Sequence, residues 1–115
     1  MSWGSVEIED EVRDWYVDLS EEFQGRVQRN VDRLAEYGPL LDEPFTRQLE
    51  GPVRELRFVL GGRNTRITYW IAAGRRIVLL TVFTKTQRRE PREIARALRA
   101  YQLCLNENHL DKEPS

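Results

Sequence analysis

Three cations occur on segments whose patterns predict neighbouring β-strands: Arg57, Arg66 and Lys85. Arg57 and Arg66 lie on the two arms of one predicted hairpin, and Lys85 ends the strand that follows, so a meander brings all three to one region. A phosphodiester would fit there. When a ribose 2′-hydroxyl attacks its own phosphorus, the transition state carries extra negative charge, which preplaced guanidinium and ammonium groups stabilise without a metal.

The segment FTKTQRREP at 83–91 connects this region to a predicted helix. Pro91 suits the first helical position, because the N–H that it lacks would be unpaired there anyway. The N-terminus of that helix, preceded by TKTQ at 84–87, can add backbone N–H groups to the same anion site.

Each of these residues also has a purely structural interpretation. Arg57 can be a cross-strand partner of Glu55 or of the acidic helices. Arg66 is the stronger candidate, because its own strand neighbours offer no counter-charge. Trp70 and Tyr69 can stack on bases, but their places in an alternating strand favour core packing. Core packing is also expected for Tyr101, which shares the apolar stripe of the last helix.

The remaining chemistry-bearing residues are few. The chain has one His and one Cys, so neither a metal site nor a Ser/His or Cys/His triad is supported, and no cofactor is expected. Cys104 is interpreted as a packing residue, and His109 as an exposed residue of the tail. No signal peptide or membrane span is predicted, which indicates a cytoplasmic protein.

Charge is strongly polarised along the 115 residues although the net charge is only −1. Residues 1–51 contain 5 basic and 13 acidic side chains, whereas residues 52–101 contain 12 and 3. This asymmetry indicates a charged partner for the basic half. The alternative, that acidic helices and a basic sheet simply pair within the fold, stays open.

Periodicity predicts an α+β fold in a single domain over 1–115, with a flexible tail from about residue 106. The expected order is a short strand near Val6 and Ile8, two helices, a three-stranded antiparallel meander and a C-terminal helix. Asp10 and Ser20 are expected to cap the first two helices, and Gly38-Pro39 to end the second. Residues 40–51 are interpreted as a loop, Gly61-Gly62 as a hairpin turn, and the last helix is expected to fade after Leu105.

Several of these segments together resemble the RelE/ParE superfamily of toxins. The segments are ELR at 55–57, G-G-x-x-x-R at 61–66 before a tyrosine, and RRIVLLTVFTKTQRREPREIARAL at 75–98. Over residues 3 to about 101, the chain is most similar to the HigB-like branch, which includes phage-derived host-inhibition proteins.

This resemblance implies a toxin that cleaves messenger RNA in the ribosomal A site without a metal and that a helix-turn-helix antitoxin holds inactive. It assigns catalytic roles to Arg57, Arg66 and Lys85, and proton transfer would fall to Lys85, Glu93 or Tyr101. A separate set of cations would bind the RNA backbone, where cations add affinity but little base specificity: Arg88, Arg89 and Arg92.

Three functions therefore remain open from the sequence. The first is a ribosome-dependent endoribonuclease, and the second is a ParE-like gyrase poison, in which the same cations need not be catalytic. The third is a non-enzymatic module that binds an antitoxin and DNA. The presence of all three strand cations favours the first over the third.

Overall fold

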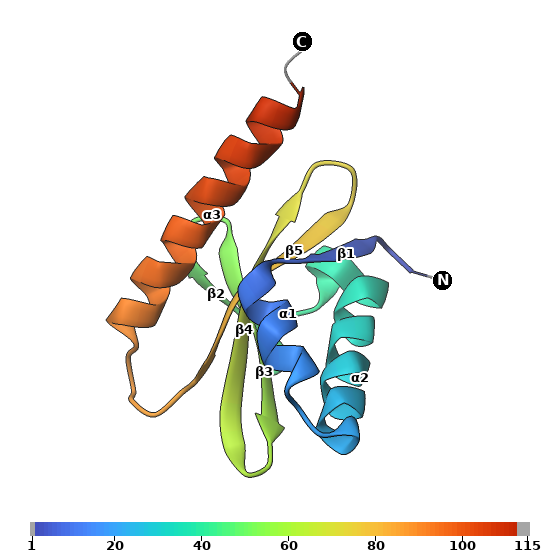
Figure 1. Cartoon of the computed structure of the whole chain (residues 1–115), viewed down its shortest axis with the longest axis vertical. Coiled ribbons are helices and arrows are strands. Elements are labelled where there is room, and N and C mark those ends of the chain that lie inside the picture. Colours follow the sequence, from blue (N-terminus) through green and yellow to red (C-terminus); the bar gives the residue numbers. More distant parts are fainter. Residues whose placement is uncertain (1, 113–115) are drawn as a thin grey trace.

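A single five-stranded sheet forms the centre of this computed structural model, which describes residues 2–112 and their side chains as far as Glu107. The strand order is β1-β5-β4-β3-β2 (Figure 1). β1 runs parallel to β5, and all other neighbours are antiparallel. The strands are β1 (Ser5–Ile8), β2 (Thr46–Glu50), β3 (Val53–Leu60), β4 (Arg63–Ala72) and β5 (Arg76–Thr84). The predicted α+β class is confirmed.

The edge strand β2 corrects the sequence interpretation, because it lies within the segment 40–51 that was expected to be a loop. It pairs with β3, so the meander has four strands rather than three. Of its side chains only Thr46 is buried and Leu49 partly so. A short and largely polar edge strand resists unwanted pairing, but it gives no clear apolar alternation by which to recognise it.

Two helices, α1 (Asp10–Val17) and α2 (Glu21–Tyr37), cover one face of the sheet (Figure 1). The Ser20 hydroxyl caps α2 as predicted, accepting a hydrogen bond from the Phe23 N–H at 3.2 Å. Gly38 ends α2 with φ +53°, at the start of the 3-10 turn η1 (Gly38–Leu40). The expected cap of α1 was wrong, since Asp10 is its first residue and Glu9 holds the cap position without a side-chain bond.

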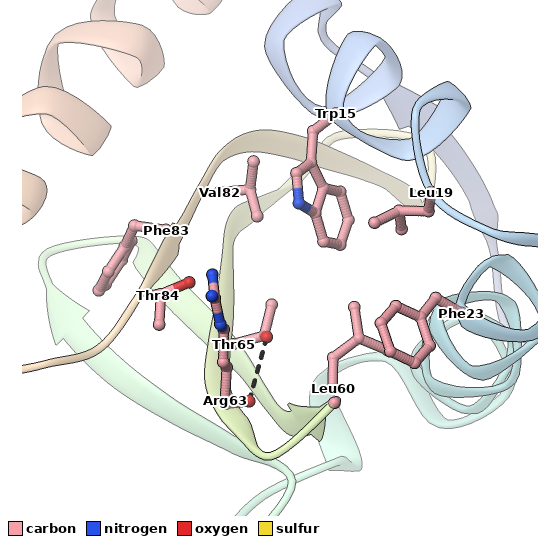
Figure 2. A pocket seen from close by; sticks show the side chains of 10 residues that line it. Trp15, Leu19, Phe23, Leu60, Arg63, Thr65, Val82, Phe83 and Thr84 are labelled. Carbon is pink, nitrogen blue, oxygen red and sulfur yellow. Dashed lines mark hydrogen bonds between the residues drawn. The ribbon is translucent and has the colours of Figure 1, made fainter.

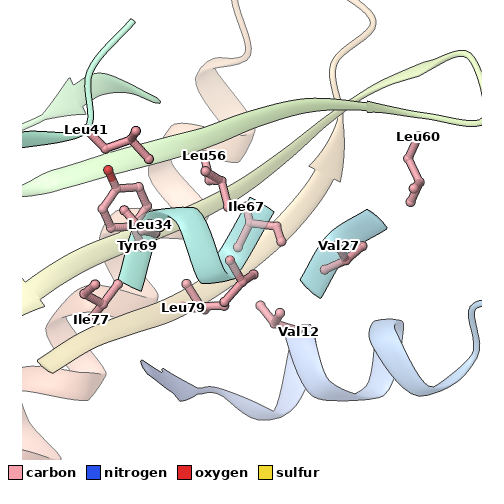
Figure 3. Close-up of a cluster of buried hydrophobic side chains, with 11 residues drawn as sticks. Val12, Val27, Leu34, Leu41, Leu56, Leu60, Ile67, Tyr69, Ile77 and Leu79 are labelled. Carbon is pink, nitrogen blue, oxygen red and sulfur yellow. The ribbon is translucent and has the colours of Figure 1, made fainter. Parts of the chain in front are cut away.

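The side chains between this helix pair and the sheet form the larger of two cores (Figure 3). They come from α1, α2 and alternate positions of β3, β4 and β5, as the predicted period of two requires. The most deeply buried members, each 0–1% exposed, are Leu34, Leu56, Ile67, Tyr69, Ile77 and Leu79.

The opposite face is crossed by α3 (Pro91–Lys112), which begins at Pro91 as predicted (Figure 1). A smaller core lies beneath it, and Trp70 packs there edge-on to Tyr101 with ring centroids 5.0 Å apart. Cys104 is buried in this core, which confirms its packing role. Burial raises the pKa of its thiol, while a hydrogen bond with Trp70 acts in the opposite direction. β5 is apolar on both faces because it contributes to both cores.

α3 is longer than expected. It continues to Lys112 instead of fading after Leu105, because Cys104 and Leu105 still contact the smaller core and support the helix at that point. The side chain of His109, expected to be exposed, lies outside the described residues. In the described part of the chain, no helix combines the length and apolarity needed to cross a membrane.

Candidate anion-binding site

The two hairpin arginines face each other across the β3–β4 pair. Arg57 and Arg66 are direct cross-strand partners, and Oε2 of Glu55 lies 3.6 Å from Nε of each. Glu55 and Arg66 are both 6% exposed, whereas the side chain of Arg57 is 27% exposed. The single carboxylate therefore offsets the repulsion between two closely placed cations.

This arrangement corrects the expectation that Arg66 lacks a counter-charge. Its neighbours along β4 carry none, but Glu55 supplies one from β3, across the hairpin. Burial lowers the pKa of the Arg66 guanidinium, Glu55 raises it, and Arg57 lowers it further. Arg57 is a partner of Glu55, as its structural interpretation predicts. Its position beside Arg66 is also compatible with the predicted role of both arginines at a phosphate.

The buried Nε–H groups of Arg57 and Arg66 have no hydrogen-bond acceptor within the described part of the chain. The contacts of 3.6 Å to Glu55 are ion pairs but are too long to be hydrogen bonds. Buried polar groups are seldom left unpaired in proteins. Both Nε atoms are enclosed by the fold and face Glu55, so the two guanidinium groups contribute positive charge to this region and no exposed Nε–H donor.

Lys85 lies at the same end of this sheet face. Its neighbour Phe83 is the cross-strand partner of Arg66, and the Lys85 N–H donates to the Asn64 carbonyl at 2.7 Å. Because side chains alternate along a strand, Lys85 projects from the same face as Phe83 and Arg66. Its ammonium donates to the carbonyl of Arg88 at 2.9 Å. The sequence-predicted cations Arg57, Arg66 and Lys85 therefore come from adjoining positions on one face.

A cleft of about 380 Å³ opens between this sheet face, β2 and the start of α3. Its charged lining residues are Arg47, Glu55, Lys85, Arg88, Arg89 and Glu90, and its apolar ones include Leu49, Phe83 and Ile94. Four cations against two carboxylates make the cleft net positive. The predicted backbone-binding residues Arg88 and Arg89 thus line it together with Lys85.

Sequence reasoning missed two residues of this cleft, Glu55 and Arg47. Glu55 was considered only as a partner of Arg57, although alternation along β3 places the two on the same face. Arg47 was missed because β2 itself was not recognised. Arg47 pairs in register with Glu55, and that register could not be found without the strand.

The backbone N–H groups that were expected to bind an anion are already paired. The Glu90 side chain accepts hydrogen bonds at 2.9 Å from the N–H groups of both Thr86 and Gln87. These two bonds lower the pKa of the Glu90 carboxyl. The loop before α3 therefore satisfies its own donors, and the cleft's positive charge comes from side chains.

Two predicted proton-transfer residues lie elsewhere. Glu93 accepts two hydrogen bonds from Arg96, at 3.0 and 2.8 Å, and Arg96 also pairs with Glu11 of α1. Tyr101 packs on Trp70 in the smaller core. Neither residue lines the cleft with Lys85, and Arg92 is exposed on the first turn of α3. Among the described residues, no cluster of His, Cys, Asp and Glu could hold a metal.

Comparison with solved structures defines the class of this fold, which is that of RelE. The Escherichia coli toxin RelE, a mutant in the free state, matches with a TM-score of 0.59 and 13% identity, over 86% of this chain and 97% of that one. RelE in the RelE–RelB complex of the archaeon Pyrococcus horikoshii matches with a TM-score of 0.57 and 24% identity, over 76% and 99%.

The family can be stated more narrowly from the sequence. The model of the family described as phage derived protein Gp49-like matches residues 14–102, so this chain belongs to the Gp49-like family. A search among curated proteins gave no match. The matched segment contains α2, the whole meander and most of α3, and thus every residue of the cleft described above.

Proposed function

We propose that this chain is the toxin of a toxin–antitoxin pair, of the HigB-like type, and that it cleaves messenger RNA on the ribosome without a metal. The observation that carries the proposal is the buried Arg57–Glu55–Arg66 group beside the Lys85 cleft. Neither arginine lines the cleft, but their positive charge lies next to Glu55, which does, and Lys85 adds a cation in the cleft itself. The RelE-like fold and the Gp49-like family are consistent with this class of activity.

In the proposed reaction, a ribose 2′-oxygen bonds to the adjacent phosphorus while its proton is taken by a base. The bond from phosphorus to the 5′-oxygen of the next nucleotide breaks, and that oxygen receives a proton. The products are a 2′,3′-cyclic phosphate and a 5′-hydroxyl. Arg57, Arg66 and Lys85 would stabilise the charge that develops on the phosphoryl oxygens.

Glu55 is the best-placed residue to accept the 2′-hydroxyl proton. Of the two carboxylates lining the cleft, Glu90 is held by two backbone N–H groups, whereas Glu55 lies beside both arginines. Its side chain lines the cleft, where a general base must lie within hydrogen-bond reach of the 2′-hydroxyl. Lys85, at the cleft's edge, is the candidate donor to the leaving oxygen.

The proposed partner is a helix-turn-helix antitoxin. The structural match to RelE in complex with RelB supports an antitoxin partner in general. No residue of α1 or α2 lines the cleft. The cleft's excess of cations favours RNA as its ligand.

Induced expression in a bacterial host tests the proposal. The wild-type chain should arrest growth and produce cleaved messenger RNAs with 5′-hydroxyl ends inside translated frames, mapped by 5′-end sequencing. Lys85→Ala and Glu55→Gln should each lower the cleavage rate by about a hundredfold or more. The matched control is Arg29→Ala, which removes a cation from an exposed position of α2. It should leave cleavage unchanged.

Arg66→Lys complements these variants, because it keeps a buried positive charge and replaces only the planar guanidinium. It should retain the fold and lose cleavage. Intact messenger RNA during growth arrest, together with DNA breaks, would instead assign the chain to the gyrase-poison class. Cleavage that is unchanged in both Lys85→Ala and Arg66→Lys would refute the assignment of the site.

A further inference from the structure

The loop 85–90 joins the end of β5 to the start of α3 and carries three of the cations that line the cleft. β5 ends at Thr84, which faces a different cleft, of about 460 Å³, on the α1–α2 side (Figure 2). Successive side chains of a strand alternate between faces, so Lys85 projects to the other side, where it lines the candidate site with Arg88 and Arg89. The path of this loop therefore determines where the three charges lie.

This loop contains no apolar side chain that could anchor it. Apart from its two ends its residues are exposed, and the order of such a segment depends on its hydrogen bonds. The Lys85 ammonium donates to the Arg88 carbonyl at 2.9 Å. The N–H groups of Thr86 and Gln87 both donate to Oε1 of Glu90, each at 2.9 Å. Two of these three loop-closing bonds therefore depend on one carboxylate.

Glu90 also holds the cap position of α3, because its carbonyl accepts a hydrogen bond from the Ile94 N–H at 3.0 Å. Ser, Thr, Asp and Asn are preferred at such caps, since their short side chains reach the donors of the first helical turn. The Glu90 side chain turns back to the loop instead. These two bonds, together with the nearby charge of Lys85, lower the pKa of its carboxyl. Glu90 thus remains ionised, and hydrogen bonds to a charged acceptor are the stronger kind.

We propose that Glu90 is a positioning residue for the cleavage reaction: its carboxylate closes the loop and so fixes Lys85, and with it Arg88 and Arg89, at the cleft. The inference rests on the proposed ribonuclease function and adds to it a residue that acts through Lys85. Catalysis depends on the position of charged groups to within about 1 Å, whereas affinity for a polyanion depends mainly on the number of cations. Loss of the Glu90 carboxylate should therefore slow cleavage without weakening RNA binding.

Single-turnover cleavage of messenger RNA on programmed ribosomes tests this separation of rate from affinity. A titration with the protein gives both the maximal rate and the half-saturating concentration. Glu90→Ala should lower the maximal rate by about tenfold or more, and the half-saturating concentration should not rise. Glu90→Gln keeps an oxygen that can accept both N–H groups, so it should retain the rate to within about threefold. An equal loss in both variants would overturn the role of these hydrogen bonds.

Two control variants match Glu90→Ala in different respects. Ser20→Ala removes the cap of α2, which lies outside the cleft, and Glu36→Ala removes a carboxylate from an exposed position of α2. Both should leave the maximal rate and the half-saturating concentration unchanged. A fall in the maximal rate of Ser20→Ala as large as that of Glu90→Ala would assign the effect to helix stability and overturn the positioning role.

NMR spectroscopy of the free protein reports on the loop directly and does not depend on cleavage. In Glu90→Ala, the amide proton resonances of Thr86 and Gln87 should move upfield, because both groups lose their acceptor. The heteronuclear NOE of residues 85–90 should fall as the backbone gains motion on the ps–ns timescale. Unchanged resonances and NOE values would overturn the closing of the loop by Glu90.

The wild-type chain separates this inference from the proposed function. If it cleaves messenger RNA and Glu90→Ala cleaves equally fast, the role of Glu90 alone is overturned. If the wild-type chain cleaves no messenger RNA, the proposed function is overturned, and the positioning role in cleavage with it.

Discussion

The two faces of the sheet are built from the same strands but differ in chemistry. On the α1–α2 side, apolar residues of β3, β4 and β5 form a continuous core along the strands. On the α3 side, the apolar core stops at Trp70 and Leu80, and the positions beyond it carry Glu55, Arg57 and Arg66. One face supplies stability, and the other combines a smaller core with a charged cleft.

The difference follows from how far each set of helices extends over the sheet. α1 and α2 together cover their face, whereas α3 begins only after the loop 85–90 and crosses the other face diagonally (Figure 1). The uncovered end of that face is where ionisable side chains can keep contact with solvent. Even paired buried charges often stabilise a fold no more than well-packed apolar side chains would, which is consistent with the functional role proposed for this group.

Truncation of Ile67 to alanine should have the largest effect on stability. Ile67 is 0% exposed in the larger core, and Ile67→Ala should lower the free energy of unfolding by about 3–5 kcal/mol through lost burial and the cavity left behind. Ile94→Ala, the same change at a partly exposed position on the cleft side, should cost about 1 kcal/mol. Urea unfolding measures both, and equal losses would contradict the proposed difference between the faces.

The charged group should respond to substitution in a way that an apolar core does not. Glu55→Leu leaves Arg66 buried without its carboxylate and should cost about 2–3 kcal/mol, less than for a fully enclosed pair because Arg57 remains partly solvated. In the double variant Glu55→Leu, Arg66→Leu, both buried charges are gone.

Most of that loss should therefore be regained in the double variant, while RNA cleavage stays abolished. Urea unfolding of the wild-type chain, Glu55→Leu, Arg66→Leu and the double variant forms a double-mutant cycle. The cycle measures the interaction free energy between Glu55 and Arg66. Additive losses would show that Glu55 and Arg66 do not interact in the folded chain, and would remove the electrostatic basis of the site.

The sequence predicted the elements whose periodicity reports burial. Ile67, Tyr69 and Ile71 against Thr68 and Trp70 gave the two faces of β4, and Pro91 gave the start of α3. β2 could not be predicted, because an edge strand needs only one paired side and its residues are mostly solvated. A periodic pattern of apolar residues shows which side of a segment is buried. A segment that is mostly exposed has no such pattern.

The candidate site was predicted in part for a related reason. The prediction that the meander brings the cations Arg57, Arg66 and Lys85 to one region needed only the order of the strands. The position of Glu55 between two guanidinium groups depends on the register of β3 against β4, which the Gly61-Gly62 turn sets. The pairing of Glu90 with Thr86 and Gln87 depends on the path of a loop, which has no period.

The smallest expected effects concern two glutamates and have opposite signs: Glu7 on β1 and Glu9 at the cap position of α1. A hydrogen bond from Arg76 lowers the pKa of Glu7. The charged form therefore stabilises the fold above the unfolded pKa, about 4.3, and this contribution is lost as the pH falls through the lower folded pKa. Burial, followed by the charge of Glu107, raises the pKa of Glu9.

For Glu9 the stabilising form is therefore the neutral one, and its contribution is lost as the pH rises through the raised folded pKa. Near pH 7, Glu7→Gln should lower the free energy of unfolding and Glu9→Gln should increase it, each by less than about 1 kcal/mol because both side chains retain solvent contact. As the pH falls below the folded pKa of each group, both carboxyls become neutral and the two differences should shrink. Urea unfolding across this pH range tests the signs. A loss of stability in both variants at pH 7 would contradict the expectation that burial of the charged Glu9 carboxylate destabilises the fold.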